Sequence, residues 1–147
     1  MAKRNGAAST ILLLYRAMRC ADELFASSIG ELELTPRQFI ILAAIAEAEE
    51  PSKKLLESLT GMDRATLADH VRRLVQRKLV ERRRTKLDAR AYALRLTDNG
   101  KVLLAQARPA ADQTQKRLLS ALAKTRREAF LDALVRVVAD LSKAETA

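Results

Sequence analysis

Apolar residues recur every three or four positions along most of this chain, which is the spacing of amphipathic helices. The first stripe spans residues 10–29 and is wide enough to suggest that a partner helix covers part of it. A second helix is expected to start at Thr35, where Pro36 and Gln38 supply a first-turn proline and a capping box. It should reach about Ala48. The core positions predicted for it are Phe39, Leu42, Ala43 and Ala46.

A short helix, a glycine turn and a further helix are predicted next. Ser52 is the expected N-cap of the first, whose inward residues would be Leu55, Leu56 and Leu59. Gly61 supplies the positive φ that a tight turn needs, and Asp63 caps a helix that runs to about Lys78. The residues predicted to be buried on this last helix are Leu67, Val71 and Leu74.

The second half of the chain predicts a hairpin followed by two longer helices. Residues 79–84 and 92–96 read as strands joined by a basic connection, residues 85–91. Thr97 restarts a helix that continues to about Leu122, and a capping box from Thr125 to Glu128 begins the last one. That helix carries an apolar stripe at Phe130, Leu134, Val137, Val138 and Leu141. The expected fold is mainly α with a small β-hairpin, in the order of a winged helix-turn-helix.

The positive charge of the chain is concentrated in this middle region. The formal net charge is +9, and residues 64–95 hold eleven Arg or Lys against three acidic residues. A charge excess gathered in about a fifth of the chain points to a polyanionic partner rather than to general solubility. A solvated basic face is the alternative.

The helix that begins at Asp63 is the candidate recognition helix, because the second helix of such a motif enters the major groove. Near its start, Arg64 and Thr66 are placed to read bases, while a small Ala65 or Ala68 permits close approach or contact with a thymine methyl. Later arginines are better placed for phosphates. The outward set comprises Arg64, Ala65, Thr66, Ala68, Asp69, Arg72 and Arg73, with Arg77 beyond it. An exposed helix with merely structural arginines is the competing interpretation.

These segments resemble the MarR (multiple antibiotic resistance) family of transcription regulators. The resemblance covers residues 34–100 best. It rests on LTPRQF at 34–39, TGMDRATL at 60–67, LVER at 79–82, DAR at 88–90 and LTDNG at 96–100. It implies a single domain over residues 1–147, with a DNA-binding lobe at 34–96. Residues 10–33 plus 97–147 would be the dimerisation helices.

The resemblance also implies a homodimer that binds a near-palindromic operator in double-stranded DNA. Arg90 of the wing would enter the minor groove, where a narrow A·T-rich tract attracts an arginine. Asp88 would hold nearby basic groups in place, with Arg73 and Arg90 as its candidate partners. Arg84 and Lys86 of the same hairpin join the expected DNA-contacting residues. An ordinary turn beside a solvated arginine is the alternative.

Many members of this family respond to small aromatic acids, phenols or their thioesters. The resemblance therefore implies a repressor that such an anionic effector releases. The candidate pocket residues are Tyr15, Met18, Arg19, Phe25 and Phe39. The same side chains at helical spacing also fit an ordinary core, so a winged-helix protein without an effector remains open.

Few residues suited to catalysis are present. One histidine, one cysteine, no phosphate-binding glycine loop and no Ser/His/Asp set argue against an enzyme, and no cofactor or metal is expected. His70 is expected to be packed or capping. Cys20 is expected to be a buried inert thiol, with a redox-sensing regulator as the alternative. Without a spanning stretch or a disulfide pair, we expect a cytoplasmic protein away from the membrane. RNA or protein binding is the remaining use of a basic winged helix.

Overall fold

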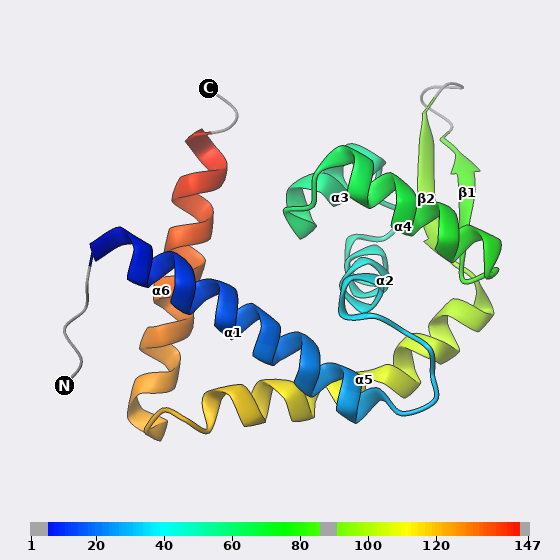
Figure 1. Ribbon diagram of the computed structural model, residues 1–147. Helices are drawn as coiled ribbons and strands as arrows, with labels where there is room; N and C mark the ends of the chain where they lie inside the picture. Colours follow the sequence, from blue (N-terminus) through cyan, green and yellow to red (C-terminus); the bar gives the residue numbers. More distant parts are fainter. Residues whose placement is uncertain (1–5, 86–90, 145–147) are drawn as a thin grey trace.

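The computed structural model describes residues 6–85 and 91–144, and the described part holds six helices and one two-stranded antiparallel hairpin (Figure 1). Their order confirms the predicted winged helix-turn-helix followed by long helices. The elements are α1 (Gly6–Ile29), α2 (Pro36–Ala48), α3 (Lys53–Thr60), α4 (Arg64–Gln76), β1 (Val80–Arg84), β2 (Tyr92–Leu96), α5 (Asp98–Leu119) and α6 (Lys124–Ala144).

Local capping starts four of the helices where the sequence predicted. Thr35 Oγ1 accepts the Gln38 amide at 3.2 Å, and the Gln38 side chain accepts the Thr35 amide at 3.2 Å. Ser52, Asp63 and Thr97 accept the amide three residues on in the same way. Each cap satisfies a backbone donor that the first helical turn leaves free. Gly61, at φ +67°, ends α3 as expected.

The start of α6 differs from the prediction. The helix begins at Lys124, so Thr125 lies inside its first turn and is not the N-cap of a capping box. One tight turn precedes the helix, since Leu122 N–H donates to Leu119 O, and a second overlaps its start, since Arg126 N–H donates to Ala123 O. The second turn already includes Lys124 and Thr125, so Thr125 stands within the helix and not before it.

The hairpin is anchored to the segment between α2 and α3. β1 pairs antiparallel with β2 from Val80 opposite Leu96 to Arg84 opposite Tyr92. On the other side of β2, the Leu94 amide donates to Pro51 O at 2.9 Å, next to an isolated bridge between Ser52 and Ala93. β2 therefore lies between two backbone partners, β1 on one side and the segment between α2 and α3 on the other.

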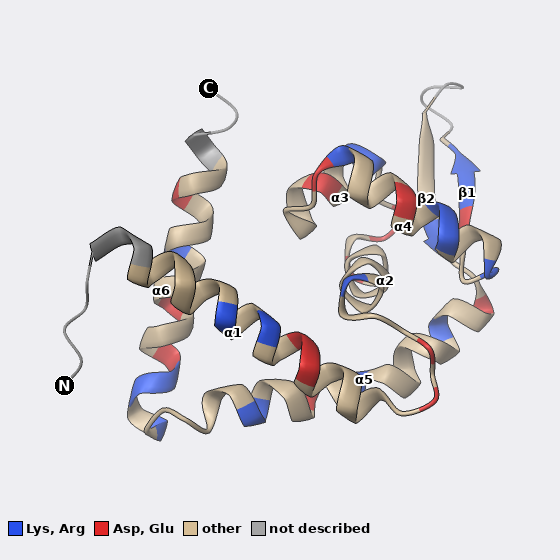
Figure 2. Cartoon of the chain, viewed as in Figure 1, with Lys and Arg blue, Asp and Glu red and all other residues tan. Residues whose placement is uncertain are grey.

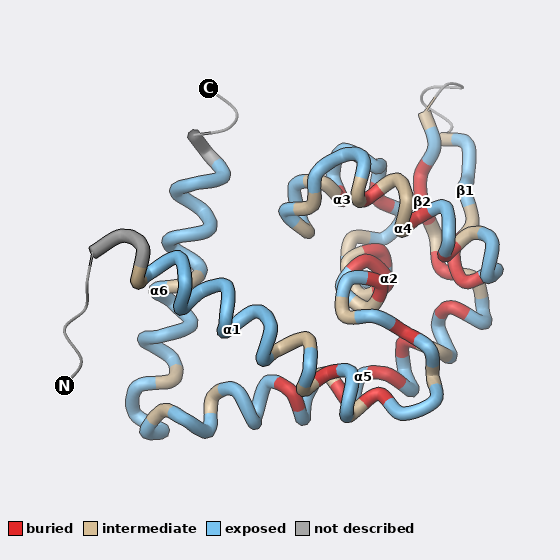
Figure 3. The backbone as a smooth tube through the Cα atoms, viewed as in Figure 1, coloured by how far each residue is buried: buried red, intermediate tan, exposed pale blue. Residues whose placement is uncertain are grey.

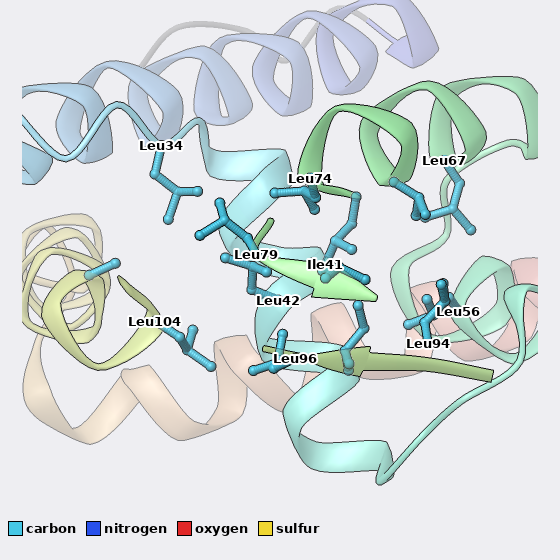
Figure 4. Close-up of a cluster of buried hydrophobic side chains, with 14 of the residues drawn as sticks. Leu34, Ile41, Leu42, Leu56, Leu67, Leu74, Leu79, Leu94, Leu96 and Leu104 are labelled. Carbon is cyan, nitrogen blue, oxygen red and sulfur yellow. The ribbon is translucent and has the colours of Figure 1, made fainter. Parts of the chain in front are cut away.

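The core lies where α2, α3, α4, β1 and β2 meet α5 and the C-terminal end of α1 (Figure 4), and α4 contributes its three predicted residues. The face of α2 differs from the prediction: Gln38, Ile41, Leu42 and Ile45 are buried, Phe39 and Ala43 are half-buried and Ala46 is exposed. Because α2 is apolar almost all round and has neighbours on several sides, its spacing alone did not define one face. On α3 only Leu56 is buried, and Leu55 and Leu59 are exposed.

The long helices extend away from this core. α5 packs along α1 and contains Pro109 without ending there, and α6 stands at the far end of α5 (Figure 1). The N-terminal half of α1 and nearly all of α6 are exposed (Figure 3). Within the described ranges, no helix is long and apolar enough to cross a membrane.

Candidate nucleic-acid interface

Asp63 determines how α4 begins. Its carboxylate accepts the Thr66 amide at 2.9 Å and the Thr66 hydroxyl at 2.6 Å. These hydrogen bonds, the hydroxyl first, hold the pKa of the Asp63 carboxyl below its usual value. The Thr66 hydroxyl proton is thereby committed to the cap, so this side chain offers only an acceptor to a base. The donors near the start of α4 must come from Arg64.

One carboxylate orients two arginines on the exposed side of α4. Asp69 Oδ1 lies 2.5 Å from Arg72 Nη2, and Asp69 Oδ2 lies 3.0 Å from Arg73 Nε. The hydrogen bond from Arg72 is the main cause that lowers the pKa of Asp69, and the nearby charge of Arg73 adds to it. From the family resemblance we expected Asp88 of the wing to orient an arginine. Among the described residues, it is Asp69 of α4 that pairs with two arginines in this way.

Arg77 has a structural contact that its position in the sequence did not indicate. Its Nη1 donates to Glu33 O at 2.8 Å, which ties the end of α4 to the loop between α1 and α2. The side chain is still exposed. Its expected phosphate contact must therefore share a guanidinium that already holds this backbone carbonyl.

The strand leading to the wing is strongly basic (Figure 2). Arg82, Arg83 and Arg84 are exposed, and Arg83 Nη1 lies 3.6 Å from Glu50 Oε1. Across the hairpin the Arg95 Nε donates to Glu81 at 2.7 Å. Arg83 is thus partly balanced by an acid, whereas Arg82 and Arg84 form no ion pair with the described residues. Lys86, Asp88 and Arg90 lie outside the described residues.

Two lysines that were not among the predicted DNA-binding residues lie beside the start of α4. Lys53 and Lys54 of α3 line a surface groove of about 440 Å³ together with Arg64 and Ala68 of α4. A signal was present, because basic residues in the first turn of a helix oppose its dipole and need another reason to be there. Arg64 and Ala65 are exposed here, while Thr66, Ala68 and Asp69 are half-buried.

Comparison with known proteins decides the family. The profile described as "MarR family" matches residues 32–91. The transcriptional regulator HosA of Escherichia coli is 32% identical over 104 residues, which cover 71% of this chain and 76% of HosA. The chain belongs to the MarR family. It thus shares its family with transcription regulators and has their winged-helix fold.

Two solved MarR-family relatives have the same fold over most of their length. A probable transcriptional regulator from Pseudomonas aeruginosa is 30% identical, with a TM-score of 0.80 over 86% of this chain and 94% of that one. BpsR of Bordetella bronchiseptica, described with regulation of its DNA binding by 6-hydroxynicotinic acid, is 27% identical. The TM-score is 0.80, and the match covers 87% of this chain and 97% of BpsR. The matched region spans 64% of the length of the regulator YdgJ of Bacillus subtilis and 62% of the length of its organic hydroperoxide resistance regulator.

The candidate effector residues are only partly brought together. Met18, Phe25 and Phe39 line a cavity of about 500 Å³ between α1, α2, α5 and α6. The other two do not line it. Tyr15 is exposed, and Arg19 pairs with Glu23 at 2.7 Å on the surface of α1. Arg19 therefore lies outside this cavity, and the effector role of the five residues stays a prediction. Helical spacing placed four of these residues on α1 and Phe39 on α2, but it did not show which side of α1 faces α2.

Cys20 is exposed, which corrects the expectation of a buried thiol. Cys20 lines a shallow surface groove together with Ser27 and Arg117. Phe25, in contrast, belongs to the hydrophobic core. His70 is half-buried, as a packed residue would be. Its Nδ1 is buried without a hydrogen-bond partner among the described groups.

Proposed function

We propose that this MarR-family protein is a homodimeric repressor that binds near-palindromic double-stranded DNA and is released by a small ligand. The observation that carries the proposal is the basic surface of α4 and β1. Arg64, Arg72 and Arg73 of α4 and Arg82 and Arg84 of β1 are exposed, beside Lys53 and Lys54. A helix presented by a buried core with arginines along its free face suits a major groove and its flanking phosphates.

The roles we propose within this surface follow from position along α4. Arg64 and Ala65 at its start would meet base edges, with Thr66 as an acceptor and Ala68 allowing close approach. Arg72, Arg73 and Arg77 would contact phosphates, with Asp69 orienting the first two. Arg84, Lys86, Asp88 and Arg90 would form the wing contact. BpsR supports a DNA-binding role for this surface as a whole, since DNA binding is stated for that relative.

Dimerisation is proposed from the exposed apolar residues of α1 and α6, in residues 10–33 and 97–147. Val135, Val138 and Leu141 of α6 are each exposed by about two thirds, as is Ile11 of α1. Apolar side chains gathered on two helices that the rest of the chain leaves uncovered are typical of an interface. A two-fold dimer would present two copies of α4 to half-sites about one helical turn apart, roughly 10 bp.

Release by a ligand is proposed from the cavity beside Phe25 and Phe39. It lies between helices of the DNA-binding lobe and the proposed dimer helices, so an occupant that favours one arrangement would change the spacing of the two reading heads. The acidic class of effector relied on Arg19, which lies outside the cavity. The aromatic acid named for BpsR supports a ligand in this family, and the apolar lining supports an aromatic one.

Selection from a random duplex pool of roughly 30 bp tests the DNA-binding proposal. We expect enrichment of a near-palindrome, and an affinity that falls steeply with salt as bound phosphates release counterions. RNA duplexes of the selected sequence should bind more weakly, because their deep, narrow major groove excludes a helix. Equal binding of RNA, or enrichment of a single asymmetric half-site, contradicts the proposal.

A redox-sensing regulator is the second candidate function, favoured by the exposure of Cys20. An accessible thiol is open to oxidation by peroxide, whereas a buried one is protected. Organic hydroperoxide should then weaken DNA binding in the protein as it stands but not in Cys20→Ser. A regulator that ignores peroxide excludes this candidate and leaves the DNA-binding proposal intact.

A further inference from the structure

The cavity between α1, α2, α5 and α6 has one charged residue in its lining, and that residue is an acid. Among the described residues around it, Asp22 of α1 is ionisable, and the rest are apolar or neutral. Asp22 is half-buried, and neither a hydrogen bond nor an ion pair engages its carboxylate within the described part of the chain. Asp22 is the only charge among the described residues of the lining, and a positive charge beside it is attracted, so a cationic occupant is favoured there.

The neutral polar groups of the lining also favour a ligand that donates hydrogen bonds. Thr114 is buried, and its hydroxyl donates to Ala110 O at 2.8 Å within α5. With its proton committed, Thr114 Oγ1 can only accept. Gln115, the third polar lining residue, can both accept and donate. Two of the three polar side chains therefore present acceptors to the cavity.

The start of α2, which adjoins the cavity at Pro36, does little for an anion. Pro36 has no amide hydrogen, and the Gln38 amide donates to Thr35 Oγ1 at 3.2 Å. The Thr35 amide is taken by the Gln38 side chain. The donors that usually hold an anion at a helix N-terminus are largely occupied by the capping box.

The walls of the cavity suit an aromatic body. The rings of Phe25 and Phe39 lie 5.4 Å apart at 46°, and Phe130 of α6 joins the lining. A ring face also attracts a cation through its quadrupole, which adds to the charge of the carboxylate. The volume of about 500 Å³ is within the range of small-molecule sites.

We infer that this cavity binds a small aromatic cation, a protonated amine whose ammonium group meets Asp22 and Thr114 and whose ring packs on Phe25 and Phe39. The inference rests on the proposed ligand-released repressor and gives the chemical class of its effector. The charge inferred for the effector is positive, opposite to that of the anionic effector implied by the family resemblance. The change follows from the cavity lining, which contains Asp22 and excludes Arg19.

Calorimetry on the full chain tests this with three probes of one shape: 2-(1-naphthyl)ethylammonium, the corresponding alcohol and the corresponding carboxylate. The ammonium should bind about tenfold or more tightly than either of the others, which is the usual range for a hydrogen bond to a charged group. Asp22→Asn should remove that preference and leave the alcohol unchanged. Glu23→Gln is the matched control, because Glu23 is the next residue, is exposed and lies outside the lining.

Tighter binding of the carboxylate overturns the inference, as do equal affinities for the three probes or binding of none. A preference that persists in Asp22→Asn overturns it too. If Asp22→Asn does not fold, the ranking of the probes on the unaltered protein decides alone. Binding to the selected DNA duplex, measured without probe, is a separate readout: its loss contradicts the proposed function, whereas a wrong ranking with intact DNA binding contradicts only the inferred effector.

Discussion

Gly100 lies against the Leu79 carbonyl so closely that a Cβ added to it would come within 2.0 Å of that oxygen. The contact joins the first turn of α5 to the link between α4 and β1, where the Thr97 amide also donates to Leu79 O at 3.1 Å. The proposed recognition helix and the hairpin therefore depend on one glycine for their position on α5. Any side chain here would push the DNA-binding lobe away from the long helix.

Gly100→Ala should lower the free energy of unfolding by about 3 kcal/mol, because backbone must move to admit the methyl group. In an unobstructed helix the same change stabilises by about 1 kcal/mol, so the sign is diagnostic. Denaturant unfolding followed by circular dichroism measures it. Gly61→Ala is the control, because a Cβ at Gly61 would meet open space. Its free energy of unfolding should fall only by the cost of a left-handed φ for alanine, about 1–2 kcal/mol. Equal losses in the two variants would contradict the close approach.

The stability of the protein should fall as acid protonates Asp63. The folded-state pKa of Asp63 is lowered by its bonds to Thr66, so its contribution is present above the unfolded pKa, about 3.9. That contribution is lost as the pH falls through the folded value. Asp63→Asn keeps an N-cap acceptor without this titration. The difference in unfolding free energy between the two proteins should shrink from pH 6 to pH 3, and a constant difference would argue against the cap.

Removing the carboxylate of Asp69 should strengthen binding to arbitrary duplex DNA and weaken the preference for the selected sequence. Arg72 and Arg73 would lose the group that orients them, while one negative charge disappears beside the phosphates. We expect the slope of log affinity against log salt to steepen by about 1 in Asp69→Asn. Gel shifts over a salt series measure both effects. Asp112→Asn, an exposed acid on α5, should leave them unchanged.

The wing is tested through Arg90, whose role comes from the family resemblance. Arg90→Ala should weaken binding to the selected duplex by about 1–3 kcal/mol if the arginine enters a minor groove. The melting temperature should stay the same, because substitutions away from a core have small effects. Arg126→Ala at the start of α6 is the matched loss of one positive charge. Equal binding by both variants would leave residues 88–90 as an ordinary turn.

A charge on the exposed face of α6 should separate the proposed dimer without unfolding the chain. Val138 is 64% exposed in the single chain, so Val138→Glu costs the folded subunit little. At an interface the same carboxylate would be buried without a partner. Sedimentation should show a monomer for Val138→Glu and a dimer for Arg136→Ala. A dimeric Val138→Glu would place the interface elsewhere.

Capping and the inner face of α4 were predictable because the groups involved are neighbours along the chain. Thr35, Ser52, Asp63 and Thr97 each bind an amide three residues away, and no distant residue is needed to decide that. The spacing of Leu67, Val71 and Leu74 left a single apolar side, so their burial also followed from periodicity. Where the pattern had one solution, local chemistry was enough.

Where a helix offers several apolar sides, only its neighbours select one. Ile41 and Ile45 are buried on α2 in place of Ala46 because α4, α5 and β2 surround that side of the helix. The link from Arg77 to Glu33 spans 44 residues and has no local signature. Tertiary packing likewise turned Asp22 toward the cavity and Arg19 toward solvent, although the two lie three residues apart on α1. Periodicity determines which residues share a face of a helix, and the charge that reaches a cavity depends on what packs against that face.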